Sequence, residues 1–159
     1  MRSQTFRHRA CRVVCRRRAG AAAVELALVS PLLIVIVLGA IDVGQFVNVG
    51  QVVSNASRQG ARSASRKSAA NVSDVETVVQ NYLAGAFPNV PASDIAGGVQ
   101  VDVRDSAGNA IAGGDLTTLA SGSAVSVRVA LEFDPVRWMR GVDYLSGQAI
   151  ETTTVMRRE

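Results

Sequence analysis

Residues 21–41, AAAVELALVSPLLIVIVLGAI, contain one charged side chain, Glu25, in 21 positions. At 1.5 Å per residue a helix of this length rises about 31 Å, close to the roughly 30 Å hydrocarbon core of a bilayer. Twelve of its residues are Leu, Ile or Val, which favour insertion by roughly 4–7 kcal/mol on the translocon scale. The stretch therefore predicts a transmembrane helix over residues 21–42, with a kink at Pro31, which lacks a backbone N–H donor.

The basic charge of the chain is concentrated before this helix. Residues 1–20 hold seven arginines and no acid, although the formal net charge of all 159 residues is only +4. Residues 21–159 hold ten basic and thirteen acidic side chains, a net charge of −3. The positive-inside rule predicts a single-pass topology, with a basic cytoplasmic leader over residues 1–20 and the C-terminus on the outer side. A nucleic-acid-binding arm is the alternative, but the arginines lack an interleaved aromatic pattern, so no nucleic acid is expected as a partner.

The junction between the leader and the helix carries a functional signal. The leader ends at Gly20, and Glu25 follows five residues later within the first turns of the apolar helix. A carboxylate inside a membrane helix is costly unless it has a partner. If the chain were cut after Gly20, the new amine on Ala21 could pair with Glu25 of the same or a neighbouring subunit. The alternative is an unpaired Glu25 whose carboxylate reaches the headgroups.

This junction resembles a type IV prepilin, and the longer segment resembles the TadE-like family of tight-adherence (Flp-type) pilus assembly proteins. The family pattern G-x-x-x-V-E-[FL]-A-L-[VL]-x-P is matched by Gly20, Val24, Glu25, Leu26, Ala27, Leu28, Val29 and Pro31. A second block, A-x-R-x-G-A-R, is matched by Ala56, Arg58, Gly60, Ala61 and Arg62. The resemblance covers about residues 16–66, and the rest of the chain shows no recognisable motif.

The resemblance implies a minor pilin or pseudopilin in pilus assembly, cut by prepilin peptidase after Gly20. Its expected partners are prepilin peptidase, other pilin subunits and membrane lipid. It would reside in the bacterial cytoplasmic membrane and enter a surface pilus. One alternative is an uncleaved single-span protein whose exported domain binds a ligand or a cell-wall polymer. Another is a secreted protein released by signal peptidase, for which Leu38-Gly39-Ala40 is the nearest cleavage candidate.

Apolar and small residues continue at helical spacing beyond the membrane segment, so the helix is expected to extend over residues 43–68 and to end near Arg66. Arg58, Arg62 and Arg66 recur every four residues and form a basic stripe. With Gly60, which allows close approach, they are candidates for a subunit contact. A solvated helix face is the alternative reading of the arginines.

Residues 69–159 are expected to form an exported α+β domain. A second helix is predicted over Asp74–Phe87, with Ser73 as N-cap, Glu76 completing a capping box, and one apolar face formed by Val75, Val78, Val79, Tyr82, Leu83 and Phe87. Period-two alternation predicts strands over residues 99–104, 124–133 and 147–156. Short connections favour an antiparallel sheet covered on one face by the long helix. The predicted fold class is therefore α+β and pilin-like.

The sequence offers no catalytic constellation, so no enzyme activity, cofactor or small-molecule substrate is expected. Its one histidine, His8, and its two cysteines, Cys11 and Cys15, all lie in the leader. Without further ligands they make a poor zinc pattern. A calcium site is conceivable around a glycine-rich turn that holds Asp102, Asp105, Asn109 and Asp115, although the spacing matches no EF-hand loop.

Overall fold

The computed structural model describes the backbone of residues 8–137 and 145–159, and side chains from Gly20 onward within those ranges. The chain divides into two compact units, Met1–Ile41 and Asp42–Glu159. We call these the N-terminal and the C-terminal unit. The helix α1 (His8–Ser65) contributes to both.

The backbone of α1 remains helical through Pro31, even though this residue has no N–H to donate to the carbonyl of Ala27. The hydroxyl of Ser30 donates to that carbonyl oxygen at 3.4 Å, a long hydrogen bond that partly replaces the missing one. A side-chain donor beside the proline thus allows the helix to continue. The kink expected at Pro31 stays a prediction.

The C-terminal unit is built on a three-stranded antiparallel sheet in the order β1-β2-β3. Its strands are β1 (Val99–Arg104), β2 (Ala124–Glu132) and β3 (Ala149–Arg157). The long central strand pairs with β1 from Val99↔Leu131 to Arg104↔Ser126, and with β3 from Ala124↔Arg157 to Glu132↔Ala149. The three strands and the α+β class predicted from the alternating pattern are confirmed.

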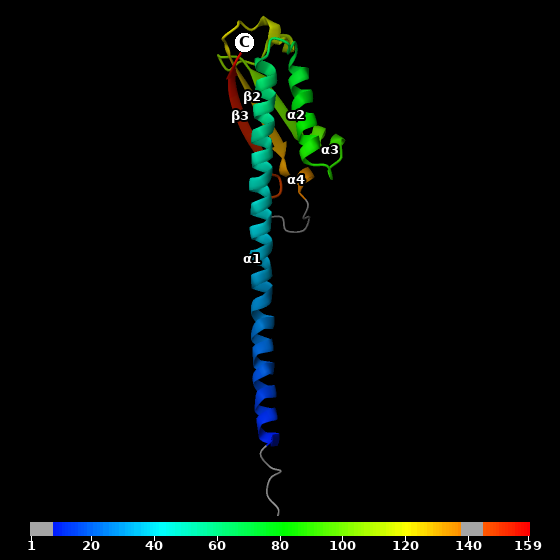
Figure 1. Ribbon diagram of the computed structural model, residues 1–159, viewed down its shortest axis with the longest axis vertical. Helices are drawn as coiled ribbons and strands as arrows, with labels where there is room; N and C mark the ends of the chain where they lie inside the picture. Colours follow the sequence, from blue (N-terminus) through cyan, green and yellow to red (C-terminus); the bar gives the residue numbers. More distant parts are fainter. Residues whose placement is uncertain (1–7, 138–144) are drawn as a thin grey trace, which may run out of the picture. The chain divides into compact units, whose positions relative to one another are not determined.

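One face of the sheet is covered by the last turns of α1 and by α2 (Val72–Ala86). Figure 1 shows both helices running along the sheet. The core between these layers consists of fully buried side chains from each element, among them Val53 and Ala56 of α1, Val79 and Leu83 of α2, and Val125, Val127, Val129 and Leu131 of β2. Alternate residues of β2 therefore face this core, as period two requires.

The start of α2 differs from the prediction. The N-cap is Asn71, and the Asp74 carboxylate accepts a hydrogen bond from the Asn71 backbone N–H at 3.2 Å. Ser73 and Glu76 therefore do not form the predicted capping box. Asn71 takes this role because it forms an isolated β-bridge with Asp115, which holds its backbone in the extended conformation (φ −130°, ψ 156°) that an N-cap requires.

The buried face of α2 is also narrower than predicted. Val75, Val79 and Leu83 are fully buried, whereas Val78 and Tyr82 are 37% and 36% exposed. The helix thus packs through one stripe at a spacing of four residues. The sequence analysis also did not predict α3 (Ala92–Gly98), the 3-10 turns η1 (Ala112–Gly114) and η2 (Leu116–Thr118), or the one-turn helix α4 (Phe133–Val136).

Candidate functional site

The junction at which the sequence predicts processing lies on an exposed part of α1. Gly20, Ala21 and Glu25 are all exposed, and nothing lies within 4 Å of the position that a Cβ on Gly20 would occupy. Ala21 and Glu25 are four residues apart, so they are neighbours on one face of the helix. Helical side chains lean toward the N-terminus, which directs the Glu25 carboxylate toward Ala21. The structure therefore places all three residues on one exposed stretch of helix, and their roles in processing and assembly stay predictions.

No other part of the described structure covers the apolar segment of α1 that follows the junction. Within the described residues the chain has one helix long and apolar enough to cross a membrane, and its most apolar window is 0% buried. Val24 is 69% exposed and Leu28 is 81% exposed. Side chains of this kind need lipid or other helices around them. This helix is consistent with a single-pass membrane protein.

The second sequence block has two faces with different roles. Ala56, Gly60 and Ala61 face the core, whereas Arg58 and Arg62 are exposed. A Cβ on Gly60 would lie 2.8 Å from Cγ2 of Val79 and 3.3 Å from Cγ1 of Val127. Gly60 therefore allows α1 to approach α2 and β2 closely, and it does not share a surface with the arginines.

The predicted basic stripe lies at the C-terminal end of α1: Arg58 and Arg62 are on its exposed face, whereas Arg66 and the neighbouring Lys67 follow directly after its last residue, Ser65. We define the basic stripe as Arg58, Arg62, Arg66 and Lys67, all exposed. The salt bridges found among the described side chains involve none of the four. Arg62 lies in the last turn of α1, where a cation interacts favourably with the helix dipole.

A buried ion pair joins Asp42, the first residue of the C-terminal unit, to Arg137, which is 95 positions further along the chain. The guanidinium of Arg137 donates to both oxygens of Asp42, at 2.9 Å from Nε and 2.7 Å from Nη2. The side chains are 3% and 1% exposed. Next to the pair, Nε2 of Gln45 donates to the carbonyl of Val136 at 3.2 Å. These contacts attach α1 to α4.

The aromatic ring of Phe133 completes this cluster. It meets Phe46 edge-to-face with centroids 5.3 Å apart, and the Arg137 guanidinium lies 5.9 Å from its centroid. Sequence reasoning treated Asp42 only as the end of the apolar run and assigned Arg137 no role. A lone acid directly after an apolar segment was the available signal.

A second buried arginine, Arg158, lies at the C-terminal end of α1. Arg158 is 6% exposed, and its guanidinium donates to the carbonyls of Ala64 at 3.2 Å and Ala69 at 3.4 Å. The last carbonyls of a helix lack partners within the helix, and a cation there also interacts favourably with the helix dipole. About two turns before the end of α1, the hydroxyls of Ser57 and Thr154 are 2.7 Å apart and join the helix to β3. The sequence analysis missed all three residues.

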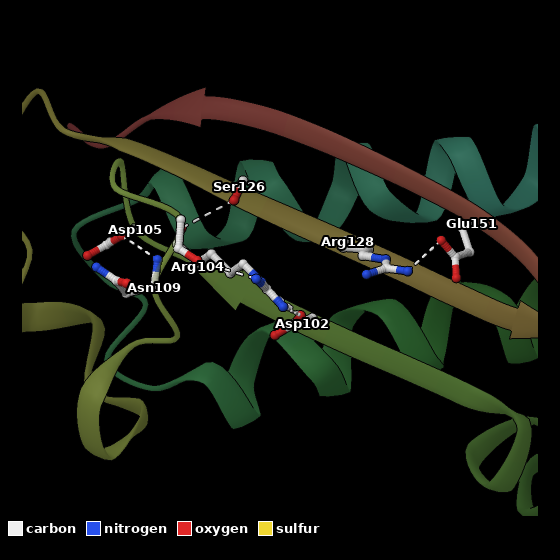
Figure 2. Close-up of polar contacts among 8 residues, drawn as sticks. Asp102, Arg104, Asp105, Asn109, Ser126, Arg128 and Glu151 are labelled. Atoms are coloured by element: carbon white, nitrogen blue, oxygen red, sulfur yellow. Dashed lines mark hydrogen bonds and ion pairs between the residues drawn. The ribbon is translucent and has the colours of Figure 1, made fainter.

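The other face of the sheet is polar. Figure 2 shows Arg104 with Asp102 and Arg128 with Glu151, two exposed ion pairs on this face. Exposed pairs of this kind contribute about 0–1 kcal/mol each. Here they keep this face of the sheet soluble while the opposite face packs against the helices.

The acids of the glycine-rich turns are engaged in local hydrogen bonds. The backbone N–H groups of Asn109 and Ala107 donate to Oδ1 of Asp105, each at 2.9 Å, and the Asn109 bond most of all lowers the pKa of Asp105. The Thr117 hydroxyl donates to Oδ1 of Asp115 at 2.6 Å, and the Thr117 backbone N–H donates to the same oxygen at 2.8 Å. Both hydrogen bonds lower the pKa of Asp115, and the bond from the hydroxyl has the larger effect. The charge of Arg158 acts on the pKa of Asp115 in the same direction.

The calcium alternative gains no support from this geometry. Asp102 is paired with Arg104, and the other two acids each accept hydrogen bonds from their own turns. In the described part of the chain, no group of three His, Cys, Asp or Glu side chains could hold a metal ion.

The features above define a class of protein: one apolar helix, the one found in the described ranges, is long enough to cross a membrane, and a small α+β unit follows it. Residues 20–62 match the family model described as TadE-like protein, which confirms the resemblance seen in the sequence. The match begins at Gly20, contains Glu25 and ends at Arg62. It suggests involvement in tight-adherence pilus assembly, and that family is generally structural. Neither the search of curated proteins nor the search of solved structures found a match.

Proposed function

We infer that this protein is a TadE-like minor pilin or pseudopilin of a tight-adherence pilus, cut by prepilin peptidase after Gly20. The observation that carries the proposal is the family match that begins at Gly20, on a helix where Glu25 lies one turn from Ala21. The basic leader would remain in the cytoplasm, and the C-terminal unit would be exported.

The role is physical and not catalytic. Hydrolysis of the Gly20–Ala21 peptide bond leaves a free amine on Ala21, which is mostly protonated at neutral pH. The Glu25 carboxylate of the same or an adjacent subunit then compensates this charge in a region of low dielectric. Exposed apolar side chains from Val24 to Val37 supply the surface on which neighbouring helices pack. The ion pair sets the axial position of each subunit.

The decisive experiment is the intact mass and N-terminal sequence of the full chain produced together with prepilin peptidase. We expect a chain that starts at Ala21. Gly20→Ala should retain the leader, whereas the matched control Gly39→Ala, in the same helix with nothing within 4 Å of its added Cβ, should mature normally. An intact leader on the unaltered protein would overturn the proposal and favour the uncleaved protein with an exported binding domain.

A second variant separates processing from assembly. Glu25→Gln keeps the size of the side chain but removes its charge, so we expect normal cleavage and loss of incorporation into pili. The readout is the amount of mature chain in sheared pilus fractions against the amount left in the membrane. Normal incorporation of this variant would refute the pairing of Glu25 with the new amine.

A further inference from the structure

The basic stripe has a counterpart on the same unit. The lining of a cleft of about 640 Å³ includes three carboxylate residues, Asp94 at the start of α3, Glu132 at the end of β2 and Asp134 in α4. Arg137 also lines it, but the Asp42 carboxylate compensates the charge of this guanidinium. All three residues are exposed. We call this region the acidic cleft. The salt bridges found among the described side chains involve none of its three acids.

The two charged surfaces lie at opposite ends of the C-terminal unit. The acidic cleft adjoins the first turn of α1 in this unit, because Val136 contacts Gln45. The basic stripe lies near the other end of α1, and Arg62 is 17 residues beyond Gln45, or about 25 Å along the helix. The sheet repeats this separation: β2 runs from Ala124, near the end of α1, to Glu132 at the cleft, about 26 Å away.

We propose that the basic stripe of one copy of this protein docks into the acidic cleft of a second copy, head to tail. Four cations meet three carboxylates in such a contact, and a contact between different surfaces of two copies generates an open chain of subunits. This inference rests on the proposed function in pilus assembly and names the partner of the arginines as the chain itself.

Lipid phosphates are the rival partner for the basic stripe, because they are anionic too. The acidic cleft is the partner that the chain itself supplies, since it presents three exposed carboxylates on the same unit. Surfaces of opposite charge on identical copies attract each other without any further component.

The contact also requires an axial offset. Two copies at the same level present stripe beside stripe and cleft beside cleft, which repel each other. A shift of about 25 Å along α1 brings a stripe to a cleft, as derived from the helix rise. The docking thus belongs to copies that are offset along the C-terminal unit, as in a filament or in detergent solution.

Cysteine crosslinking of the full chain tests the contact. In a Cys11→Ser, Cys15→Ser background, one population carries Gln59→Cys, beside the stripe arginines, and another carries Gly97→Cys, in open space at the wall of the cleft. After mixing in detergent with a short bismaleimide, we expect crosslinks between the two populations to exceed those within either population at least tenfold. Their yield should fall as salt is raised.

Charge exchange provides the matched control. Arg58→Glu with Arg62→Glu, or Asp94→Lys with Glu132→Lys, should each reduce the crosslink yield at least tenfold, because like charges then face each other. Mixing the two reversed variants, with the cysteines placed on the reversed surfaces, should restore the yield, since a reversed stripe then meets a reversed cleft. Neither reversal touches the buried core, and unfolding midpoints measured on the same samples verify the fold.

Two outcomes would overturn the proposal: crosslinks within the Gln59→Cys population that equal those between populations, or failure of the exchanged pair to restore the yield. Stripe-dependent sedimentation with anionic vesicles in place of crosslinking would assign the arginines to lipid. The intact mass of each sample shows whether the chain was cut after Gly20, so the processing proposal and the docking proposal are tested separately. A chain that starts at Ala21 without crosslinks refutes only the docking, and crosslinks on a chain that keeps its leader refute only the processing.

Discussion

The substitution Gly60→Ala tests how α1 packs in the C-terminal unit. The added Cβ would meet Cγ2 of Val79 at 2.8 Å, Cγ1 of Val127 at 3.3 Å and Cγ1 of Val75 at 3.5 Å. All three valines are 0% exposed and belong to α2 or β2, so none can move freely. Overpacking of this kind costs about 1–3 kcal/mol, and the better helix propensity of alanine returns about 0.5–1 kcal/mol. A contact of 2.8 Å is shorter than real Cβ atoms show, so the overpacking cost falls in the upper half of its range, about 2–3 kcal/mol. After a return of about 1 kcal/mol from helix propensity, the expected net loss is about 1–2 kcal/mol.

Thermal unfolding of the full chain in detergent measures this loss. Near-ultraviolet circular dichroism follows the packing of the aromatic side chains in the C-terminal unit. For a unit of this size, a loss of this magnitude corresponds to a fall in Tm of about 3–10 °C. The control is Gly50→Ala in the same helix, whose Cβ would lie 3.9 Å from Cγ2 of Ile150, an ordinary contact. It should raise Tm by a few degrees through helix propensity alone.

The result that would refute the reasoning is a Gly60→Ala protein as stable as the unaltered one, or a shift of the same sign and size for both alanine variants. Either result would mean that α1 does not pack against Val79 and Val127 at this distance. Gly60→Val serves as a second check, because two more methyl groups in the same space should lower Tm further.

Three further predictions concern polar groups. Asp42→Ala should lower the free energy of unfolding by about 3–5 kcal/mol, because it leaves the buried Arg137 charge unpaired, and denaturant titration measures the loss. Arg158→Ala should lower it by about 1.5–3 kcal/mol and speed amide hydrogen exchange near Ala64 at the end of α1. The lowered pKa of Asp115 stabilises the fold above the ordinary carboxyl pKa near 3.8, so the Tm advantage over Asp115→Asn should vanish as the pH falls through the pKa of the folded state.

The controls for these predictions come from the exposed side of the sheet. Glu151→Ala removes an exposed partner of Arg128 and should cost no more than about 1 kcal/mol. If Asp42→Ala lowered the free energy of unfolding by as little as Glu151→Ala, this would contradict the conclusion that Asp42 and Arg137 form a buried ion pair. Equal exchange rates at Ala64 with and without the Arg158 side chain would contradict its role at the helix end. A pH-independent difference in Tm between the unaltered protein and the Asp115→Asn variant would contradict the shifted carboxyl pKa.

Local periodicity predicted the main elements of this protein from the residues alone. The apolar run of residues 21–41 specifies a helix that can cross a membrane, and the alternation from Ala124 to Phe133 specifies a strand with one buried face. Both patterns repeat within a few residues, so neighbours in sequence carry the whole signal. The glycine and glutamate at the junction are equally local, since they lie within two turns of one helix.

Contacts between distant segments determined the remaining features. Whether Asn71 or Ser73 caps α2 depends on the bridge from Asn71 to Asp115, and the width of the buried face of α2 depends on the close approach of Gly60. The pairing of Asp42 with Arg137 joins residues 95 positions apart. The position of Asp42 directly after the apolar run is the one local signal, and nothing in composition or spacing identifies Arg137 as its partner. Only the packing of α1 on the sheet brings these groups within hydrogen-bonding distance and removes the water that would otherwise separate them.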